Sequence, residues 1–180
     1  MYNDIAYILI DKERLQNRVR ELGRQLAAEY EGKNPLMVCI LKGSIVFYAD
    51  LIREMNIPLE VETMTASSYG AATVSSGVVN VVSKLDSKII GRHVVLVEDI
   101  VDSGRTLAFI KSDMSNKGVL SLKVCSLLDK PSRRVADLVP DYAGFEVPDE
   151  FVVGYGLDYD QKYRNLPEIG VLKPEIYQSK

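Results

Sequence analysis

The spacing of hydrophobic residues predicts one long helix followed by a buried strand near the start of the chain. Over residues 11–31, apolar side chains recur every three or four positions, and Asp11 is suited to cap the first turn. Gly32 and Pro35 end this pattern. Residues 36–41 are then continuously apolar, which is typical of a strand that is covered on both faces.

The alternation of short apolar runs with helical spacing continues along the chain. Strands that alternate with helices favour a parallel α/β sheet. A stretch rich in Ser, Gly, Ala and Thr, about residues 67–78, has no regular period and is typical of a flexible loop over a binding site. No repeat or linker-like segment divides the chain, so we expect one domain, residues 1–180. The other expected elements are helices over 44–55 and 106–117 and strands over 58–65, 78–82, 94–97, 120–128, 143–146 and 151–153.

Composition and charge narrow the class of protein. The 180 residues are 47% hydrophobic and 26% charged, the balance of a globular protein. No apolar run approaches the ~20 residues that cross a bilayer, and the N-terminus does not resemble a signal peptide, so we expect a cytoplasmic protein without a membrane partner. A net charge of -3 gives no overall attraction for nucleic acid. Cys39 and Cys125 lie in apolar runs, which predicts reduced core thiols.

The strongest chemical signal is the segment 94–107, VVLVEDIVDSGRTL. Its apolar run delivers Glu98 and Asp99 to the carboxyl end of a buried strand, the edge where open α/β sheets bind ligands. Residues 102–106 then turn into a helix, and Gly104 allows a close approach of the backbone. Free amides at the helix start, with the hydroxyl groups of this turn, form a cradle for an anion such as phosphate.

The acidic pair needs partners other than phosphate, because carboxylates repel an anion. Ribose hydroxyls, a divalent cation or a transferred proton are suitable, so the segment matches a phosphorylated sugar. A solvated acidic loop, a receiver domain and a Walker-B-type site share parts of this pattern. The chain has neither the G-x-x-x-x-G-K-[ST] nor the G-x-G-x-x-G motif of other nucleotide sites.

Five motifs occur in order along the chain. They are LKGS at 41–44, Ser68-Tyr69, VVLVEDIVDSGRTL at 94–107, LLDK at 127–130 and GFEVPDEFVVGYGLD at 144–158. Together they resemble the motifs of the type I phosphoribosyltransferases, and especially of the short bacterial members that act on 6-oxopurines, over nearly the whole chain. This resemblance implies a central, mostly parallel sheet flanked by helices, with a small hood formed by the N- and C-terminal segments.

The resemblance also implies an activity, which is transfer of the 5-phosphoribosyl group from phosphoribosyl pyrophosphate to N9 of hypoxanthine or guanine. The products are IMP or GMP and pyrophosphate. It implies that Asp102 is the general base for the N7 proton, and a helix N-cap is the alternative role for that residue. It further implies a cis peptide between Leu41 and Lys42. The matched phosphoribosyl-binding residues are Glu98, Asp99, Asp102, Ser103, Gly104, Arg105 and Thr106.

The remaining site residues follow from the same resemblance. Pyrophosphate is expected on Lys42, Gly43 and Arg164. Magnesium is the expected cofactor, near Glu98, Asp99 and Asp158. The purine-binding residues are Lys130, which would bind O6, Phe151, which would stack on the ring, and Val152 and Asp158. Ser68 and Tyr69 belong to the loop that would close over the reaction.

Two other functions share parts of this pattern. A regulator that binds RNA with the same fold should carry a basic face, whereas this chain is acidic. A receiver domain leaves the 102–106 turn and the 144–158 motif unexplained. The only histidine, His93, precedes the buried strand, and we interpret it as structural or solvated. The resemblance also implies a homodimer or homotetramer that takes small-molecule substrates and no nucleic acid.

Overall fold

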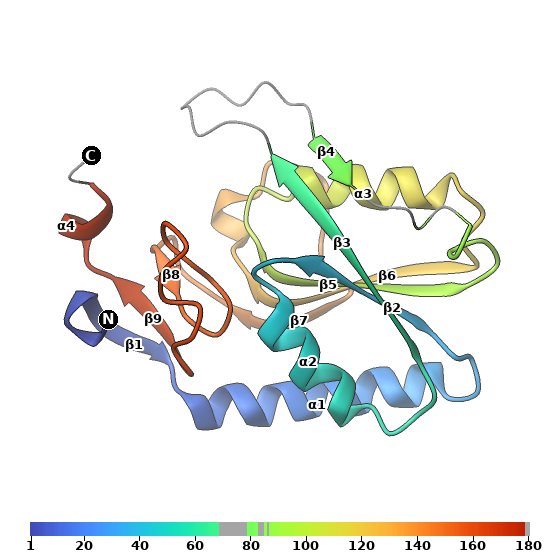
Figure 1. Ribbon diagram of the computed structural model, residues 1–180, viewed down its shortest axis with the longest axis horizontal. Coiled ribbons are helices and arrows are strands. Elements are labelled where there is room, and N and C mark those ends of the chain that lie inside the picture. Colours follow the sequence, from blue (N-terminus) through green and yellow to red (C-terminus); the bar gives the residue numbers. More distant parts are fainter. Residues whose placement is uncertain (69–78, 83–84, 86, 179–180) are drawn as a thin grey trace.

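The computed structural model describes residues 1–68, 79–82, 85 and 87–178, and it contains two sheets (Figure 1). The larger sheet has six strands in the order β4-β3-β2-β5-β6-β7. All neighbours in it are parallel except β4, which pairs with β3 in the antiparallel sense at one edge. Its strands are β2 (Leu36–Leu41), β3 (Glu60–Ser68), β4 (Val79–Val82), β5 (His93–Val101), β6 (Ser121–Asp129) and β7 (Tyr142–Glu146).

Helices cover both faces of this sheet, as a parallel α/β arrangement requires (Figure 1). Helices α1 (Lys12–Tyr30) and α2 (Ile45–Glu54) cover one face, and α3 (Arg105–Ser115) covers the other. The continuous apolar run of β2 follows from this layering. Met37 and Cys39 pack toward α1 and α2, while Val38 and Ile40 pack toward α3.

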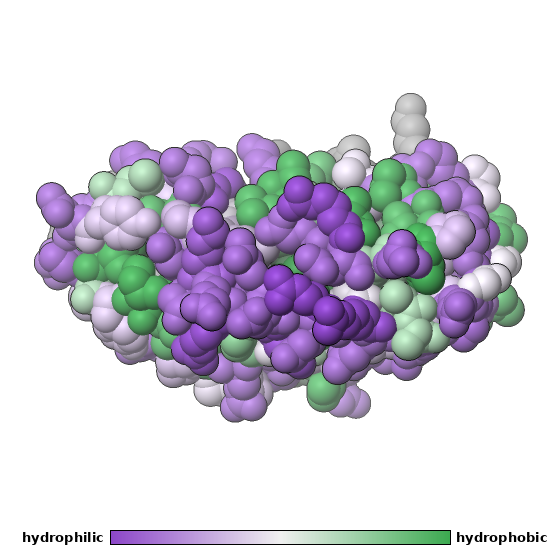
Figure 2. Space-filling model, turned by 90° about the horizontal axis from the view of Figure 1, so that it is seen from below, coloured by the Kyte–Doolittle hydropathy of each residue, from purple (hydrophilic) through white to green (hydrophobic). Residues whose placement is uncertain are grey.

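The long N-terminal helix has the amphipathic character that its sequence predicts. Its buried side chains include Leu15, Val19 and Leu22. Asp11 is its N-cap and accepts a hydrogen bond from the backbone N–H of Arg14, as expected. Seen from below, the molecule is mainly hydrophilic, with scattered hydrophobic patches (Figure 2). No helix in the described part of the chain is long and apolar enough to span a bilayer.

The smaller sheet joins the two ends of the chain. Strand β1 (Ile5–Ile10) pairs with β9 (Ile169–Leu172), and β9 pairs with β8 (Val152–Val153), both in the antiparallel sense. The short helix α4 (Pro174–Tyr177) follows β9. This sheet is the expected hood of N- and C-terminal segments. Two short 3-10 turns, η1 (Tyr2–Asp4) and η2 (Pro131–Arg133), complete the described elements.

The predictions for the two cysteines and the histidine are confirmed. Cys39 and Cys125 are free and buried. His93 lies at the amino end of β5, where its Nδ1 is 2.7 Å from Ser121 Oγ and its ring meets Tyr30 edge-on. It therefore stands at the opposite end of β5 from the acidic pair.

Candidate functional site

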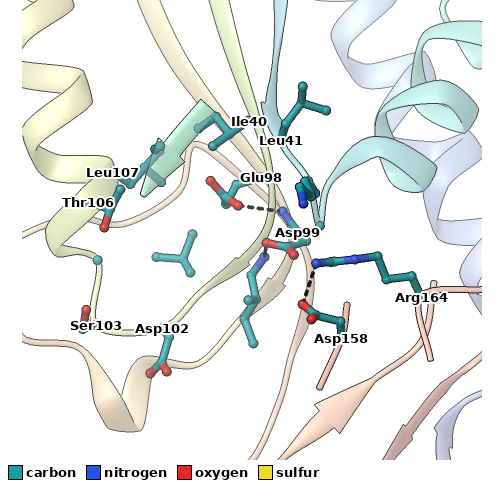
Figure 3. A pocket seen from close by; sticks show the side chains of 16 residues that line it. Ile40, Leu41, Glu98, Asp99, Asp102, Ser103, Thr106, Leu107, Asp158 and Arg164 are labelled. Atoms are coloured by element: carbon teal, nitrogen blue, oxygen red, sulfur yellow. Dashed lines mark hydrogen bonds and ion pairs between the residues drawn. The ribbon is translucent and has the colours of Figure 1, made fainter. Parts of the chain in front are cut away.

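The strands of the large sheet end together at one edge, and a cleft lies there. The switch point of the topology lies between β2 and β5, because the chain continues from β2 to β3 on one side and from β5 to β6 on the other. The cleft, of about 310 Å³, is lined by the turns after β2 and β5 and by Asp158 and Arg164 (Figure 3). Ser103 and Thr106 lie on one side of it, and Asp158 and Arg164 lie on the other.

The turn after β5 forms the start of helix α3. Gly104 is the N-cap residue and has a φ of 76°, a left-handed conformation that favours glycine. Among the described residues, no side chain caps this helix, so amides of its first turn remain available to a ligand. Ser103 and Thr106 line the cleft with their hydroxyl groups. The alternative role of Asp102 as the N-cap is wrong, because the helix begins after Gly104.

Arg134 holds this turn through hydrogen bonds to its backbone carbonyl oxygens. No pattern in the sequence indicates this role. Its guanidinium donates to the carbonyl oxygens of Asp102, at 3.0 Å, and Val101, at 3.2 Å, and it pairs with Asp129. The backbone N–H groups of Val135 and Ala136 both donate to Ser103 O. Because these bonds satisfy the carbonyls of the turn, its amides can face the cleft.

The turn after β2 forms the opposite wall. The peptide between Leu41 and Lys42 is cis, as expected. Gly43 lies so close to Asp99 that a Cβ at this position would be 1.6 Å from Asp99 Oδ2. Ser44 is fully buried and donates to Ile40 O, which fixes the far end of the turn. Lys42 is exposed and lines the cleft.

Glu98 and Asp99 are partly buried between these two walls. Asp99 Oδ1 accepts a hydrogen bond from the backbone N–H of Ile100 at 2.8 Å, and Glu98 Oε1 accepts one from Asp99 N at 3.3 Å (Figure 3). Burial, followed by the negative charge of Asp99, raises the pKa of Glu98 well above its ordinary value. Such a shift marks a site that favours a proton or a cation.

Asp158 and Arg164 form an ion pair at the third side of the cleft. Their Oδ1 and Nη2 atoms are 2.8 Å apart. Asp158 Oδ2 also accepts a hydrogen bond from Gln161 N, and Arg164 Nη1 donates to Gly156 O at 2.7 Å. Arg164 is thereby held in place where it lines the cleft.

A second cavity of about 390 Å³ adjoins the first. It shares Ile100, Asp102 and Asp158 with the first cleft. Both volumes lie in the range of about 300–1,000 Å³ that is usual for small-molecule sites. The other lining residues are Lys130, Arg133, Asp149, Glu150, Phe151, Val152, Leu157 and Tyr177.

Lys130 supplies a buried cation to this second cavity. The residue is 6% exposed, and Nζ donates to Glu150 O at 2.8 Å and lies 3.8 Å from Asp149 Oδ1. Buried ammonium groups need such partners. The ring of Phe151 also lines the cavity, so one wall is apolar and flat while another is cationic.

Asp102 stands where the two cavities meet. Its Oδ1 lies 3.0 Å from Arg133 Nε, and Arg133 Nη1 lies 3.4 Å from Asp149 Oδ1. Arg133 was not recognised in the sequence, because it comes from the η2 turn and reaches Asp102 only through the fold. The side chains of Asp102 and Arg133 are 44% and 55% exposed, so their ion pair is worth at most about 1 kcal/mol.

The fit to a magnesium ion rests on the donor types. No three His, Cys, Asp or Glu side chains gather into a metal site in the described ranges. Glu98 and Asp99 offer hard carboxylate oxygens, whereas both oxygens of Asp158 already have protein partners. Magnesium commonly uses one or two carboxylates together with substrate phosphates and water, and the pair at Glu98 and Asp99 fits this mode.

The structure brings most of the predicted residues to the two cavities. Arg105 is the exception, because it is exposed and does not line the cleft. Ser68 ends strand β3. The predicted start of the loop at residue 67 is wrong, because β3 continues through Ser68, and residues 69–78 of the loop, Tyr69 among them, lie outside the described residues.

Comparisons with known proteins agree with this architecture. The phosphoribosyl transferase domain model matches residues 9–160. Hypoxanthine-guanine phosphoribosyltransferase from Bacillus subtilis is 50% identical, over 99% of both chains. The crystal structure of a hypoxanthine phosphoribosyltransferase from Staphylococcus aureus has a TM-score of 0.94 and 47% identity, covering 98% of this chain and 96% of that one. The bifunctional protein TilS/HprT of Listeria innocua is 52% identical over 98% of this chain, which spans 27% of that protein's length.

Proposed function

The chain belongs to the phosphoribosyltransferase family, among the hypoxanthine-guanine phosphoribosyltransferases, and from this premise we propose that it makes purine nucleotides by salvage. It transfers the phosphoribosyl group of phosphoribosyl pyrophosphate to N9 of hypoxanthine or guanine. The N9 lone pair forms the bond to C1 of the sugar, and the electrons of the C1–oxygen bond leave with pyrophosphate. The N7 proton of the base passes to the protein.

The observation that carries this proposal is the meeting of two different cavities at Asp102. One has the donors and acidic groups that suit a phosphorylated sugar, and the other has the flat apolar wall and the buried cation that suit an oxopurine. A reaction that joins the two substrates must occur where their sites meet. Asp102 is a carboxylate at that junction and can accept the N7 proton there.

The sugar phosphate would bind the turn after β5. Amides of the first turn of α3 and the hydroxyls of Ser103 and Thr106 are the donors for the 5-phosphate. Pyrophosphate would lie between Lys42, Gly43 and Arg164, where two cations oppose its negative charge. The transition state is expected to resemble an oxocarbenium ion, by analogy with glycoside chemistry.

Magnesium is the cofactor that this chemistry calls for. The carboxylates of Glu98 and Asp99 would hold it, with Asp158 close by. When bound, the ion supplies neutralisation of negative charge on the pyrophosphate. The raised pKa of Glu98 is consistent with such a place, because a cation there relieves the repulsion between the two carboxylates.

The base site accounts for selection of 6-oxopurines. Lys130 Nζ is a hydrogen-bond donor with no acceptor capacity, so it matches O6 and not the amino group of adenine. Phe151 would stack on the purine, and Val152 would meet the edge of the base through its backbone. Ser68 and Tyr69 would close over the bound substrates and exclude water that hydrolyses the activated sugar.

The proposal includes the location, the oligomeric state and the partners of the enzyme. We place the enzyme in the cytoplasm, where it acts on small-molecule substrates as a homodimer or homotetramer. Nucleic acid and membrane are not among its proposed partners, in keeping with the net charge of -3.

A spectrophotometric assay tests this function. Purified protein is mixed with phosphoribosyl pyrophosphate, magnesium and, separately, hypoxanthine, guanine, xanthine, adenine and uracil. Turnover of hypoxanthine or guanine, but not of adenine or uracil, is the expected result. A folded protein without turnover on any base would contradict it, and RNA filter binding would then test the regulator instead.

A further inference from the structure

The C-terminal helix α4 brings an aromatic side chain to the base cavity. Tyr177 stacks on Phe151, with ring centroids 4.8 Å apart and planes inclined by 24°. Tyr159 meets the same ring edge-on, with centroids 5.5 Å apart at 88°. Phe151 and Tyr177 both line the cavity that contains Lys130. Phe151 is therefore stacked against Tyr177 on one face, and Tyr159 packs perpendicular to it.

The backbone around Tyr177 is tied to the rest of the hood. Leu172 N donates to Phe151 O at 2.8 Å, so the strand before α4 also holds the backbone of the stacking residue. Lys173 N donates to Asp4 O at 2.9 Å, and Lys173 Nζ donates to Asn3 O at 2.8 Å. Tyr177 therefore lies on a segment that is fixed at both the strand and the N-terminal turn.

We propose that Tyr177 is a positioning residue of the base site, which holds the ring of Phe151 in the orientation that a purine requires. This inference rests on the proposed function. Tyr177 covers one face of the Phe151 ring, and Phe151 still lines the cavity beside Lys130 where the base would bind. Stacked aromatic pairs gain energy beyond simple burial, so Tyr177 restricts the ring before the substrate arrives.

The effect should appear in binding of the base and not in the chemical step. The groups that meet phosphate, pyrophosphate and the N7 proton line the first cleft or its junction with the second, whereas Tyr177 lines only the second cavity. Loss of its ring lets Phe151 adopt other rotamers, and the base must then order that side chain on binding. The KM for the base rises, while kcat and the KM for phosphoribosyl pyrophosphate stay near their wild-type values.

Steady-state kinetics of Tyr177→Ala, Tyr177→Leu and Tyr177→Phe test the proposal. We expect the KM for hypoxanthine and for guanine to rise roughly two- to ten-fold in the Ala variant, as the loss of one stacked pair implies. Tyr177→Phe keeps the ring and should match the wild type. Tyr2→Ala is the control, since Tyr2 is a 55% exposed tyrosine of the N-terminal turn that does not line the base cavity.

The Leu variant keeps apolar packing in the hood but removes the aromatic ring. It therefore tests the loss of stacking in a folded protein, and thermal melting shows whether the variant is folded. An unchanged KM for the base in a folded Leu variant would overturn the proposal. So would a lower KM, which would mean that Tyr177 competes with the purine, or a loss of kcat alone. The wild type serves a different purpose, because its failure to turn over any base would refute the proposed function itself.

Discussion

Among single residues, Asp102 is partly exposed and makes only a weak ion pair. It lies at the junction of the two cavities and is paired with Arg133. An ion pair this exposed contributes at most about 1 kcal/mol, so it holds Asp102 only weakly. The carboxylate is thus held near the reacting atoms without being committed to a strong structural bond.

Replacing Asp102 with Asn should separate chemistry from binding. The amide keeps the size of the side chain but cannot accept the N7 proton, so we expect kcat to fall about 100-fold or more. The KM values should change only a few-fold. Asp113→Asn, on the exposed side of α3, is the matched control and should retain normal kinetics. Near-normal turnover of Asp102→Asn or Asp102→Ala would remove the assignment of Asp102 as the base.

Glu98 should link stability to pH. The pKa of Glu98 is raised in the folded state above its unfolded value of 4.5. Its favourable contribution to the free energy of unfolding is therefore fully present below pH 4.5 and is lost as the pH rises through the higher pKa of the folded state. In a chelator, Glu98→Gln should therefore become more stable relative to the wild type as pH increases from 4.5. Urea unfolding at a series of pH values measures the difference, with Glu31→Gln as the exposed control. A difference that is independent of pH would contradict this account.

Some of these residues were accessible from sequence and others were not. Glu98, Asp99 and Ser103 are close together in the chain, so their local pattern predicts a phosphosugar site without knowledge of the fold. Arg133 and Arg134 act on the same turn from about thirty positions away, and an arginine in a surface turn carries no distinguishing pattern. The roles of Lys130 and Phe151 came from the family resemblance and not from spacing.

At the scale of elements, the close approach of two turns shapes the pyrophosphate wall. A Cβ on Gly156, which has a φ of 106°, would be 2.0 Å from Gly43 O. The segment around Gly156 is also tied to α2, because Tyr155 Oη donates to Asp50 Oδ2. The position of the turn at Lys42 therefore depends on the loop that carries Asp158 and Arg164.

Gly156→Ala should disturb both stability and catalysis. We expect Gly156→Ala to lower the free energy of unfolding by at least about 2 kcal/mol more than Gly91→Ala does. Both substitutions strain the backbone, but only the one at Gly156 adds a clash with another backbone segment. Gly91 is a matched control, with a φ of 67° and no atom within 4 Å of the place that a Cβ would take. Denaturant unfolding measures both variants. Equal losses in the two would show that the approach of Gly156 to Gly43 is unimportant.

The central elements were predictable because burial on two faces leaves a continuous apolar run. Strand β2 has the predicted limits, 36–41. Strand β5 is longer than the predicted 94–97 and extends over His93–Val101. Its polar residues Glu98 and Asp99 interrupt the apolar run, but pairing with β6 continues through Val101 and Asp129. The sequence pattern alone does not predict strands β1 and β9, because their pairing joins the two ends of the chain.

In the whole molecule, the carboxyl edge of the large sheet carries the first cleft, and the hood completes the base cavity. The core on the α1 and α2 face continues into the hood through Val152, Leu157 and Ile169. The parts of the site on the large sheet and those on the hood are thereby packed together. Sequence patterns predicted the sheet and its acidic edge, whereas the hood over that edge was expected only from the resemblance.

The same packing should protect both thiols. Burial raises the pKa of Cys125 to about 12 and also raises that of Cys39. Because the thiolate is the reactive form, neither cysteine of the folded protein should react quickly with Ellman's reagent at pH 8. Both should react in denaturant, which serves as the control. Rapid reaction of a folded sample would mean that one of these core regions opens readily.

A product nucleotide should span the two cavities, and a crystal structure with bound GMP would show whether it does. We expect the 5-phosphate on the 102–106 turn, within hydrogen-bonding distance of Ser103 and Thr106. We expect the base beside Phe151, with O6 facing Lys130 Nζ and N7 facing Asp102. A phosphate bound away from this turn, or a base outside the Lys130 cavity, would refute the proposed site.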